Sequence, residues 1–303
     1  MKIVFAGSPE YAVPALKAVH EKYGVTAVIT QPDKPVGRKK ILTPTPVKAE
    51  AQKLGIPVYD FVKIRKHADE VKALGADIMI TCAYGQLLTQ DILDCFEKGV
   101  WNLHASLLPK FRGASPIQAA ILAGETHTGV TVMRTELALD CGDILLVKRC
   151  EIGDKTCAEL SEVLSALSAE AAVEAVELIG RGNPQLLMQD EAKATFCKKI
   201  NKEDCRIDFS HSAGDICRLI RAMNPEPYAW CCQNGAVLNI ARATAVEMSG
   251  AIGEVVSADK RGIVVGCGSG AIRIEELQPA GGKLMKGADY VNGRKIKAGD
   301  KLD

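Results

Sequence analysis

This sequence of 303 residues lacks the common signatures of nucleotide-binding enzymes. The first strand candidate is followed by Gly7-Ser-Pro-Glu10 and not by Gly-x-Gly-x-x-Gly, and the phosphate-binding Walker pattern is also missing. A nicotinamide or nucleotide cofactor is therefore disfavoured, although the fold class described below would by itself suggest one.

The chain also lacks the usual spacing of metal-binding cysteines. It has eleven cysteines, none of them in a Cys-x-x-Cys pair, and their number is odd. Zinc sites of the ribbon type need such pairs, so we expect no metal. The thiols are expected to be reduced and mostly to fill small apolar spaces.

Long apolar runs and an excess of charge are missing as well. No stretch approaches the roughly 20 apolar residues of a membrane span, and Met1-Lys-Ile-Val-Phe5 leads into a strand without a signal peptide. We expect a cytoplasmic monomer without a membrane partner. Lys plus Arg number 38 and Asp plus Glu 37, giving a net charge of +1. Any nucleic-acid contact must therefore come from local basic patches.

Strand and helix candidates alternate over the first part of the chain. The strands are expected at residues 2–7, 25–30, 56–59, 77–83, 100–104, 129–135 and 144–150. This alternation predicts an α/β, Rossmann-like, mainly parallel sheet with helices on both faces. Ligands bind such sheets beyond the carboxyl ends of the strands, where Tyr84, Asn102 and His104 fall.

The second part of the chain has a different pattern. A long helix is expected at residues 156–182, and a polar stretch at residues 185–203 is typical of a linker. Apolar runs separated by turns follow, with a hairpin signal at Asn234-Gly235. Further strands are expected at residues 251–257, 262–267 and 271–277. We therefore expect a first domain at residues 1–184 and a small β-barrel domain at residues 204–303.

Asn102 and His104 form the most informative pair of polar residues. Residues two apart on a strand share a face, and an amide beside an imidazole suits acyl transfer. The pair alone is a weak signal, because a histidine at a strand end is more often only hydrogen-bonded. His104 is nevertheless the one histidine of five that follows a buried strand. Its expected carboxylate partner is Asp140, although Asp140-Cys-Gly-Asp143 is by itself typical of an ordinary β-turn.

The surrounding residues resemble the folate-dependent formyltransferase family. The resemblance rests first on Asn-Leu-His-Ala-Ser-Leu-Leu-Pro-Lys-Phe-Arg-Gly at residues 102–113 and on Leu139-Asp-Cys-Gly-Asp143. Further matching motifs are Phe5-Ala-Gly-Ser-Pro-Glu-Tyr11, Gln31-Pro-Asp-Lys-Pro-Val-Gly-Arg-Lys-Lys40 with Pro46-Val-Lys48, and Ile220-Arg-Ala-Met-Asn-Pro-Glu-Pro227. Essentially the whole chain is covered. The resemblance implies an OB-like second domain and formyl transfer from 10-formyltetrahydrofolate to the amine of methionine on initiator tRNA.

The resemblance also implies roles for individual residues. The catalytic residues would be Asn102, His104 and Asp140, with Asp143 capping or orienting the loop. The residues expected to line the folate site are Ser106, Leu107, Leu108, Pro109, Tyr84, Gly85 and Gln86. Tyr11 is a candidate wall for the methionine side chain. No metal is implied, because the formyl donor is already activated.

Two groups of cations are candidates for tRNA contacts. The first group is Lys34, Arg38, Lys39, Lys40 and Lys48 on a proline-studded loop. The second is Lys283, Lys286, Arg294, Lys295, Lys297 and Lys301 near the C-terminus. Both could instead be solvated surface charge. The loop lacks a glycine that one form of the family motif has after the arginine, so it can present its lysines differently. Lys110 and Arg112 either meet acidic or phosphate groups or are solvated.

Three alternative functions stay open at this point. A sugar-nucleotide N-formyltransferase can share the core motif, but the basic loop at residues 31–40 and the motif at residues 220–227 argue against it. A glycinamide ribonucleotide formyltransferase would lack the second domain. A noncatalytic RNA-binding protein would not need Asn102, His104 and Asp140.

Overall fold

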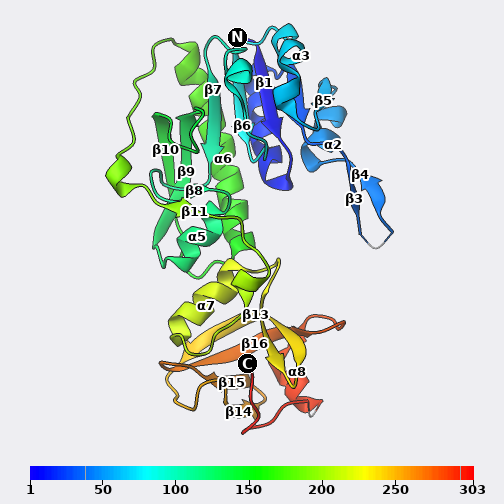
Figure 1. Cartoon of the computed structure of the whole chain (residues 1–303), viewed down its shortest axis with the longest axis vertical. Coiled ribbons are helices and arrows are strands. Elements are labelled where there is room, and N and C mark those ends of the chain that lie inside the picture. Colours follow the sequence, from blue (N-terminus) through cyan, green and yellow to red (C-terminus); the bar gives the residue numbers. More distant parts are fainter. Residues whose placement is uncertain (38, 294) are drawn as a thin grey trace. The chain divides into compact units, whose positions relative to one another are not determined.

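The computed structural model describes residues 1–37, 39–293 and 295–303. Their contacts divide the chain into two compact units, whose elements are labelled in Figure 1. The first unit is Met1–Pro116, His127–Glu151 and Ser161–Cys197, and the second is Ile117–Thr126, Ile152–Leu160 and Lys198–Asp303. The change from the first unit to the second after Cys197 falls within the stretch expected as a linker, residues 185–203. Two short segments from earlier in the chain also group with the second unit.

A seven-stranded sheet in the order β10-β9-β7-β6-β1-β2-β5 forms the centre of the first unit. Its strands are β1 (Ile3–Gly7), β2 (Ala27–Thr30), β5 (Val58–Asp60), β6 (Ile78–Cys82), β7 (Val100–His104), β9 (His127–Arg134) and β10 (Ile144–Glu151). The neighbours from β5 to β7 pair in parallel, whereas β9 is antiparallel to both β7 and β10. The predicted mainly parallel sheet is confirmed. Its strand order reverses between β1 and β6, which is where such sheets bind ligands.

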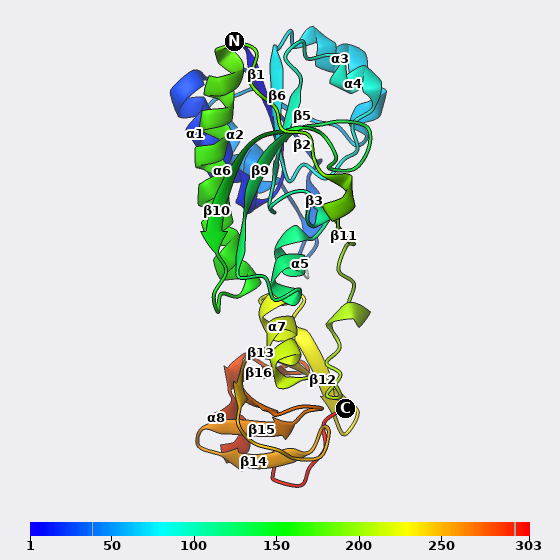
Figure 2. The ribbon, with the colours of Figure 1, turned by 90° about the vertical axis from the view of Figure 1, so that its left-hand side faces the viewer.

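Helices cover both faces of this sheet. The helices of the first unit are α1 (Val13–Tyr23), α2 (Pro46–Lys53), α3 (Ala68–Ala73), α4 (Gln90–Leu93) and most of the long α6 (Cys157–Gly180). The short helix α5 (Pro116–Leu122) belongs, apart from Pro116, to the second unit. Figure 2 shows α1 and α6 on one side of the sheet and α3 and α4 on the other. The core on the α3 and α4 side contains Val4, Ala6 and Ile29 from the strands together with Ile64 and Ile92. Apolar residues of alternating strand positions thus pack against these helices.

The start of α1 differs from the expected one. The pair Ser8-Pro9 predicts an N-cap and the first helical residue, but a 3-10 turn at Glu10–Ala12 comes first and Ser8 caps no helix. The Ser8 hydroxyl instead donates to the carbonyl of Tyr84 at 3.3 Å and accepts from the main-chain nitrogen of Gln31 at 3.3 Å. It therefore joins the loops that follow β1, β2 and β6.

Several short elements were not expected from the sequence. They are β3 (Lys34–Val36), β4 (Ile41–Thr43), β8 (Arg112–Gly113), β11 (Phe196–Cys197) and the further 3-10 turns Ile64–Lys66, Glu191–Lys193 and Glu203–Cys205. β3 and β4 form an antiparallel hairpin from the basic loop, and β8 pairs in parallel with β11.

The second unit contains an antiparallel sheet in the order β12-β13-β16-β15-β14, with β17 also paired to β16. Its elements are α7 (Ala213–Ala222), β12 (Ala229–Gln233), β13 (Ala236–Val246), β14 (Val255–Asp259), β15 (Gly262–Gly266), β16 (Ala271–Pro279), β17 (Met285–Lys286) and α8 (Gly287–Asn292). Asn234 and Gly235 turn the β12–β13 hairpin with positive φ angles of 51° and 78°. Isolated bridges join Gln233 to Leu302 and Glu254 to Lys301, linking both edges of the sheet to the C-terminal residues. This arrangement is compatible with the expected OB-like barrel.

Candidate active site

Asn102 and His104 lie at the carboxyl end of β7, as the two-residue spacing predicts. Trp101 and Leu103 alternate with them and are buried. The Thr81 hydroxyl on the neighbouring β6 donates a hydrogen bond to Asn102 Oδ1 at 2.9 Å. Because this bond occupies the carbonyl oxygen, the amide nitrogen is the end of Asn102 that can donate to a ligand. The strand pair therefore orients Asn102 as a hydrogen-bond donor.

The buried imidazole of His104 lies between two acceptors. Its Nε2 is 2.9 Å from the main-chain oxygen of Phe111, and its Nδ1 is 3.7 Å from Oδ2 of Asp140. The second distance is longer than a hydrogen bond but suits an ion pair with a protonated ring. The structure thus brings the expected carboxylate close and adds a carbonyl that the sequence did not indicate.

The Asp140 loop is held in an unusual backbone conformation. Asp140 has a φ of 51°, which costs a non-glycine residue about 1–3 kcal/mol unless its surroundings impose it. Its Oδ2 accepts a hydrogen bond from the Gly113 nitrogen at 2.8 Å. A Cβ on Gly142 would lie 1.8 Å from the Arg134 carbonyl oxygen, so only glycine fits there. The Arg134 nitrogen donates to the carbonyl of Asp143 at 2.9 Å, which fixes the end of the loop through the main chain.

Two residues of the expected linker, Gln189 and Glu191, belong to this site. Gln189 Nε2 donates to the carbonyl oxygens of Asp140 and Gly142 at 2.9 and 2.7 Å. Arg112 makes two bonds to Glu191, at 2.9 and 2.6 Å, and two to Oε1 of Gln189. No local pattern in the sequence indicates these residues, because their partners lie between 47 and 79 positions away.

Arg112 therefore meets an acidic group of its own chain and is not a solvated cation. Its side chain is only 3% exposed. The hydrogen bonds with Glu191 raise the pKa of Arg112 and lower the pKa of Glu191. The positive charge of Arg112 is therefore neutralised by Glu191 within the first unit. Lys110 is exposed, so the two cations that the motif places together have different surroundings.

The expected folate loop after β7 is fixed by its own side chains. The Ser106 hydroxyl donates to the Lys110 carbonyl at 2.7 Å. Thr131 on β9 donates to the Ser106 carbonyl at 2.7 Å and accepts from the Leu108 nitrogen at 3.2 Å. Leu108 packs with Met133 and Ile144, while Leu107 and Pro109 are half-buried. This loop can therefore contact a ligand through its main-chain groups and its apolar side chains.

The loop after β6 is built in the same way. The Gln86 side chain accepts from the Ile64 nitrogen at 2.9 Å and donates to the Phe61 carbonyl at 2.7 Å. Gly85 has a φ of 79°, which favours glycine. Burial raises the pKa of Tyr84, and its hydroxyl has no hydrogen-bond partner among the described residues. Rigid loops whose side chains are already bonded suit recognition of a flat ring edge by main-chain groups.

Tyr11 faces α6 with its hydroxyl group. This hydroxyl lies 2.9 Å from the Ser168 hydroxyl, and burial raises the pKa of Tyr11. Only the ring of Tyr11 is left for contact with a methionine side chain, so that contact stays a prediction.

The cations of the basic loop fall into different environments. Lys39 and Lys40 are exposed where β3 turns into β4, and Lys34 donates to Gln31 Oε1 at 2.8 Å. Arg38, the fourth expected contact of the hairpin, lies outside the described residues. Lys48 is on α2 and pairs with Asp33 and Asp60, each at 2.7 Å, and these bonds, that with Asp33 first, raise its pKa. Lys48 is therefore not available for RNA.

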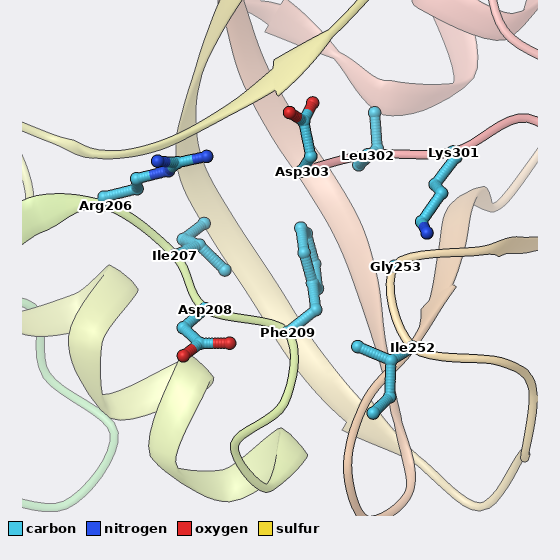
Figure 3. Close-up of a pocket in the computed structure, with 9 residues that line it drawn as sticks. All are labelled: Arg206, Ile207, Asp208, Phe209, Ile252, Gly253, Lys301, Leu302 and Asp303. Atoms are coloured by element: carbon cyan, nitrogen blue, oxygen red, sulfur yellow. The ribbon is translucent and has the colours of Figure 1, made fainter.

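The second group of cations belongs to the second unit. Its exposed members among the described residues are Lys283, Lys286, Lys295, Lys297 and Lys301, and Arg294 lies outside that part of the chain. Figure 3 shows a pocket of about 470 Å³ in this unit that contains Lys301. Its lining residues are Arg206, Ile207, Asp208, Phe209, Ile252, Gly253, Lys301, Leu302 and Asp303. The pocket mixes both signs of charge and contains none of the expected catalytic residues.

The described residues contain neither a cluster of metal ligands nor a membrane-spanning helix. Within residues 1–37, 39–293 and 295–303 no cluster of three or more His, Cys, Asp or Glu side chains could hold a metal ion. Over the same ranges, no helix has the length and apolar character needed to cross a bilayer. None of the eleven cysteines forms a disulfide bond among the described residues, and burial raises the pKa of Cys82 to about 12. Such a thiol is unreactive at neutral pH.

The chain matches two family models and a characterised relative. The model described as formyl transferase matches residues 1–176, and the model described as formyl transferase, C-terminal domain, matches residues 199–295. The chain is 44% identical to a methionyl-tRNA formyltransferase from Neisseria meningitidis over 308 residues, which covers 100% of both proteins.

Solved structures share the fold at lower sequence identity. WlaRD, a sugar 3N-formyl transferase solved with dTDP and 5-N-formyl-THF, has a TM-score of 0.68 at 20% identity, over 92% of this chain and 97% of WlaRD. HypX from Aquifex aeolicus in complex with tetrahydrofolic acid has a TM-score of 0.65 at 17% identity, over 96% of this chain. The chain spans about half of HypX, since 47% of that protein is covered.

Proposed function

Because the chain belongs to the formyl transferase family, we propose that it transfers a formyl group from 10-formyltetrahydrofolate to the α-amine of methionine on initiator tRNA. The relative that matches its full length at 44% identity is a methionyl-tRNA formyltransferase. Formylation of this amine would prepare the tRNA for translation initiation.

The observation that carries the proposal is the pair at the end of β7. Thr81 donates to the carbonyl oxygen of Asn102, which leaves the amide nitrogen as its donor, and His104 lies two residues further on the same face of the strand. A fixed amide donor beside an imidazole is the arrangement that acyl transfer needs.

The chemistry follows from these two groups. The methionine amine attacks the formyl carbon, the new C–N bond forms, and the bond between the formyl carbon and the folate nitrogen breaks. During attack the formyl oxygen gains negative charge, which the amide nitrogen of Asn102 would stabilise. An N–H of His104 would add to this once Nε2 exchanges the Phe111 carbonyl for the substrate, since Nδ1 faces Asp140. The amine loses a proton and the departing nitrogen gains one, and His104 is the group placed to move it. Asp140 orients the imidazole from its other side.

The loops after β6 and β7 would hold the folate. Tyr84, Gly85 and Gln86 form the first loop, and residues 106–109 form the second. The Ser106 and Gln86 side chains are used to shape these loops, so main-chain groups would recognise the pterin edge. A folate ligand is supported by the folate compounds in the WlaRD and HypX structures, whose likeness to this chain concerns the fold.

Local basic patches would hold the tRNA. The net charge of +1 provides no general attraction, so contacts must come from Lys39 and Lys40 on the β3–β4 hairpin and from the exposed lysines of the second unit. Tyr11 would contribute its ring to the methionine side chain.

A sugar-nucleotide substrate is the second candidate, because WlaRD acts on a sugar and shares the fold. A competition assay separates the two functions. Labelled 10-formyltetrahydrofolate is incubated with the protein, methionyl-tRNA and a dTDP-amino sugar. We expect the label in formyl-methionyl-tRNA, whereas label only in the sugar would overturn the proposal.

We further propose a cytoplasmic monomer, since initiator tRNA is charged in that compartment and each proposed catalytic group lies in one chain. Sedimentation of the purified protein as a single 32.4 kDa species would support the monomer, and a stable species of twice that mass would contradict it.

A further inference from the structure

We propose that residues 189–197, here called the positioning segment, hold the Asp140 loop and thereby His104 in their working arrangement. The two family models leave residues 177–198 uncovered, and the composition of this stretch predicts a linker. In the structure, however, Ser161–Cys197 is one continuous part of the first unit. The inference rests on the proposed function, because it gives the segment a role through Asp140 and His104.

The main chain of the positioning segment is bonded to the loop that follows β7. The Thr195 nitrogen donates to the Pro109 carbonyl at 3.2 Å, and the Arg112 nitrogen donates to the Thr195 carbonyl at 2.8 Å. Gly113 has a φ of 120°, and a Cβ there would lie 2.2 Å from the Cys197 carbonyl oxygen. These bonds fix the stretch that supplies the Phe111 carbonyl to His104 and the Gly113 nitrogen to Asp140.

Gln189 bridges this stretch and the Asp140 loop. It is buried, with 6% of its surface exposed. One end of its amide donates to the carbonyls of Asp140 and Gly142, and the other end accepts two N–H groups of Arg112. An amide can donate at one end and accept at the other, whereas a carboxylate has no donor. Gln189 therefore imposes the conformation in which the Asp140 carboxylate faces His104.

Glu191 keeps Arg112 directed at Gln189. The guanidinium is almost fully buried, and a buried cation without a partner is strongly unfavourable. The two oxygens of Glu191 accept from both terminal nitrogens of Arg112. This bidentate contact fixes the plane of the guanidinium and hence the N–H groups that hold Gln189. The contacts thus form a continuous series from Glu191 to His104.

Gln189→Glu is the sharpest substitution, because it keeps the shape and removes the donors. We expect kcat for formyl-methionyl-tRNA formation to fall about tenfold or more, since small displacements of catalytic groups have effects of this size. The KM values for methionyl-tRNA and 10-formyltetrahydrofolate should change less than about twofold, because no substrate contact is removed. Asp190→Asn is the matched control. Asp190 bonds only to the Ala192 nitrogen and Lys193 among the described residues, so its kcat should equal that of the parent.

Combining Gln189→Glu with Asp140→Asn shows whether Gln189 acts through Asp140. If it does, Gln189→Glu should lower kcat much less in the Asp140→Asn background than in the parent. Glu191→Gln is a milder second variant, and its loss of kcat should likewise be smaller in the Asp140→Asn background than in the parent. It replaces Gln189→Glu in this test if a melting curve shows that Gln189→Glu does not fold.

The outcomes separate this inference from the proposed function. The positioning role would be overturned if Gln189→Glu and Glu191→Gln both keep the kcat of the parent. It would also be overturned if Gln189→Glu lowers kcat by the same factor in the parent and in the Asp140→Asn background. If Asp140→Asn is slow while Gln189→Glu is normal, the proposed function stands and the positioning segment does not. If Asp140→Asn transfers formyl groups at the parent rate, the role of Asp140 and the inference built on it both fail.

Discussion

Two pairs of cations in the first unit differ in what surrounds them. Arg112 and Lys48 have side chains that are 3% and 16% exposed, and each is bonded to carboxylates. Lys39 and Lys40 are exposed at the turn of the β3–β4 hairpin. All four lie in motifs that suggested ligand contacts. The bonded cations stabilise the first unit through their carboxylate partners, whereas the exposed ones remain the candidates for RNA contacts.

The proposed catalytic side chains likewise differ from the surface residues in having fixed partners. Asn102 and His104 are held by Thr81 and by the carbonyl of Phe111, so their directions are fixed before substrate arrives. Substitutions of bonded residues should therefore change turnover or stability, whereas substitutions of exposed cations should change tRNA binding.

The largest effect is expected from a change inside the bonded region. His104→Ala should lower kcat by about two or more powers of ten, because proton movement and part of the oxyanion stabilisation are lost. The rate of formyl-methionyl-tRNA formation measures this effect. His211→Ala removes an exposed histidine and is the control. Near-normal turnover in His104→Ala would show that the imidazole is only structural.

A smaller effect is expected from Thr81→Val, which removes the hydroxyl that orients Asn102 and keeps the shape. Turnover should fall about tenfold as the amide loses its fixed direction. Thr128 is a matched control, since its buried hydroxyl has no partner among the described residues. Thr128→Val should keep the parental turnover. Equal rates in the two variants would argue against the orienting bond.

On the exposed side, Lys39→Ala/Lys40→Ala should weaken methionyl-tRNA binding several-fold. Each phosphate contact releases counterions, so the slope of log affinity against log salt should decrease by about 2. Folate binding and the melting temperature should not change. Lys53→Ala/Lys66→Ala removes the same charge from other exposed positions as a control. A parental salt slope would mean that the hairpin lysines are only solvated.

In contrast to the hairpin variant, Lys48→Met should lower stability and leave tRNA binding unchanged, so its effect on function should be the smallest. Asp33 and Asp60 lose their shared partner, so unfolding should become easier by about 1–2 kcal/mol. The salt slope of tRNA binding should stay at the parental value. Denaturant unfolding and binding curves measured on one preparation test both parts, and a flattened slope would place Lys48 among the RNA contacts.

The parts of the structure that follow from local pattern could be predicted from the sequence. The parallel sheet follows from alternating strand and helix candidates, and the shared face of Asn102 and His104 follows from strand geometry. The Asn234-Gly235 hairpin follows from the turn chemistry. The nearness of Asp140 to His104 needed the family motif, because its loop is otherwise an ordinary turn.

The parts that depend on distant partners could not be predicted. Gln189 and Glu191 look like linker residues until Arg112, almost 80 positions earlier in the chain, is placed beside them. The β3–β4 hairpin was also missed, because Pro35 and exposed residues hide its strand pattern. Ser8 was expected to cap a helix but bonds between loops, since tertiary contacts override local capping preferences.

The most direct test of the account is single-turnover formyl transfer by Asn102→Ala, with folate binding measured on the same sample. The account predicts that transfer to methionyl-tRNA slows about a hundredfold or more, because the oriented oxyanion donor is lost. Binding of the formyl donor should stay within about threefold, since the loops after β6 and β7 are intact. Transfer at the parental rate would contradict the proposed active site.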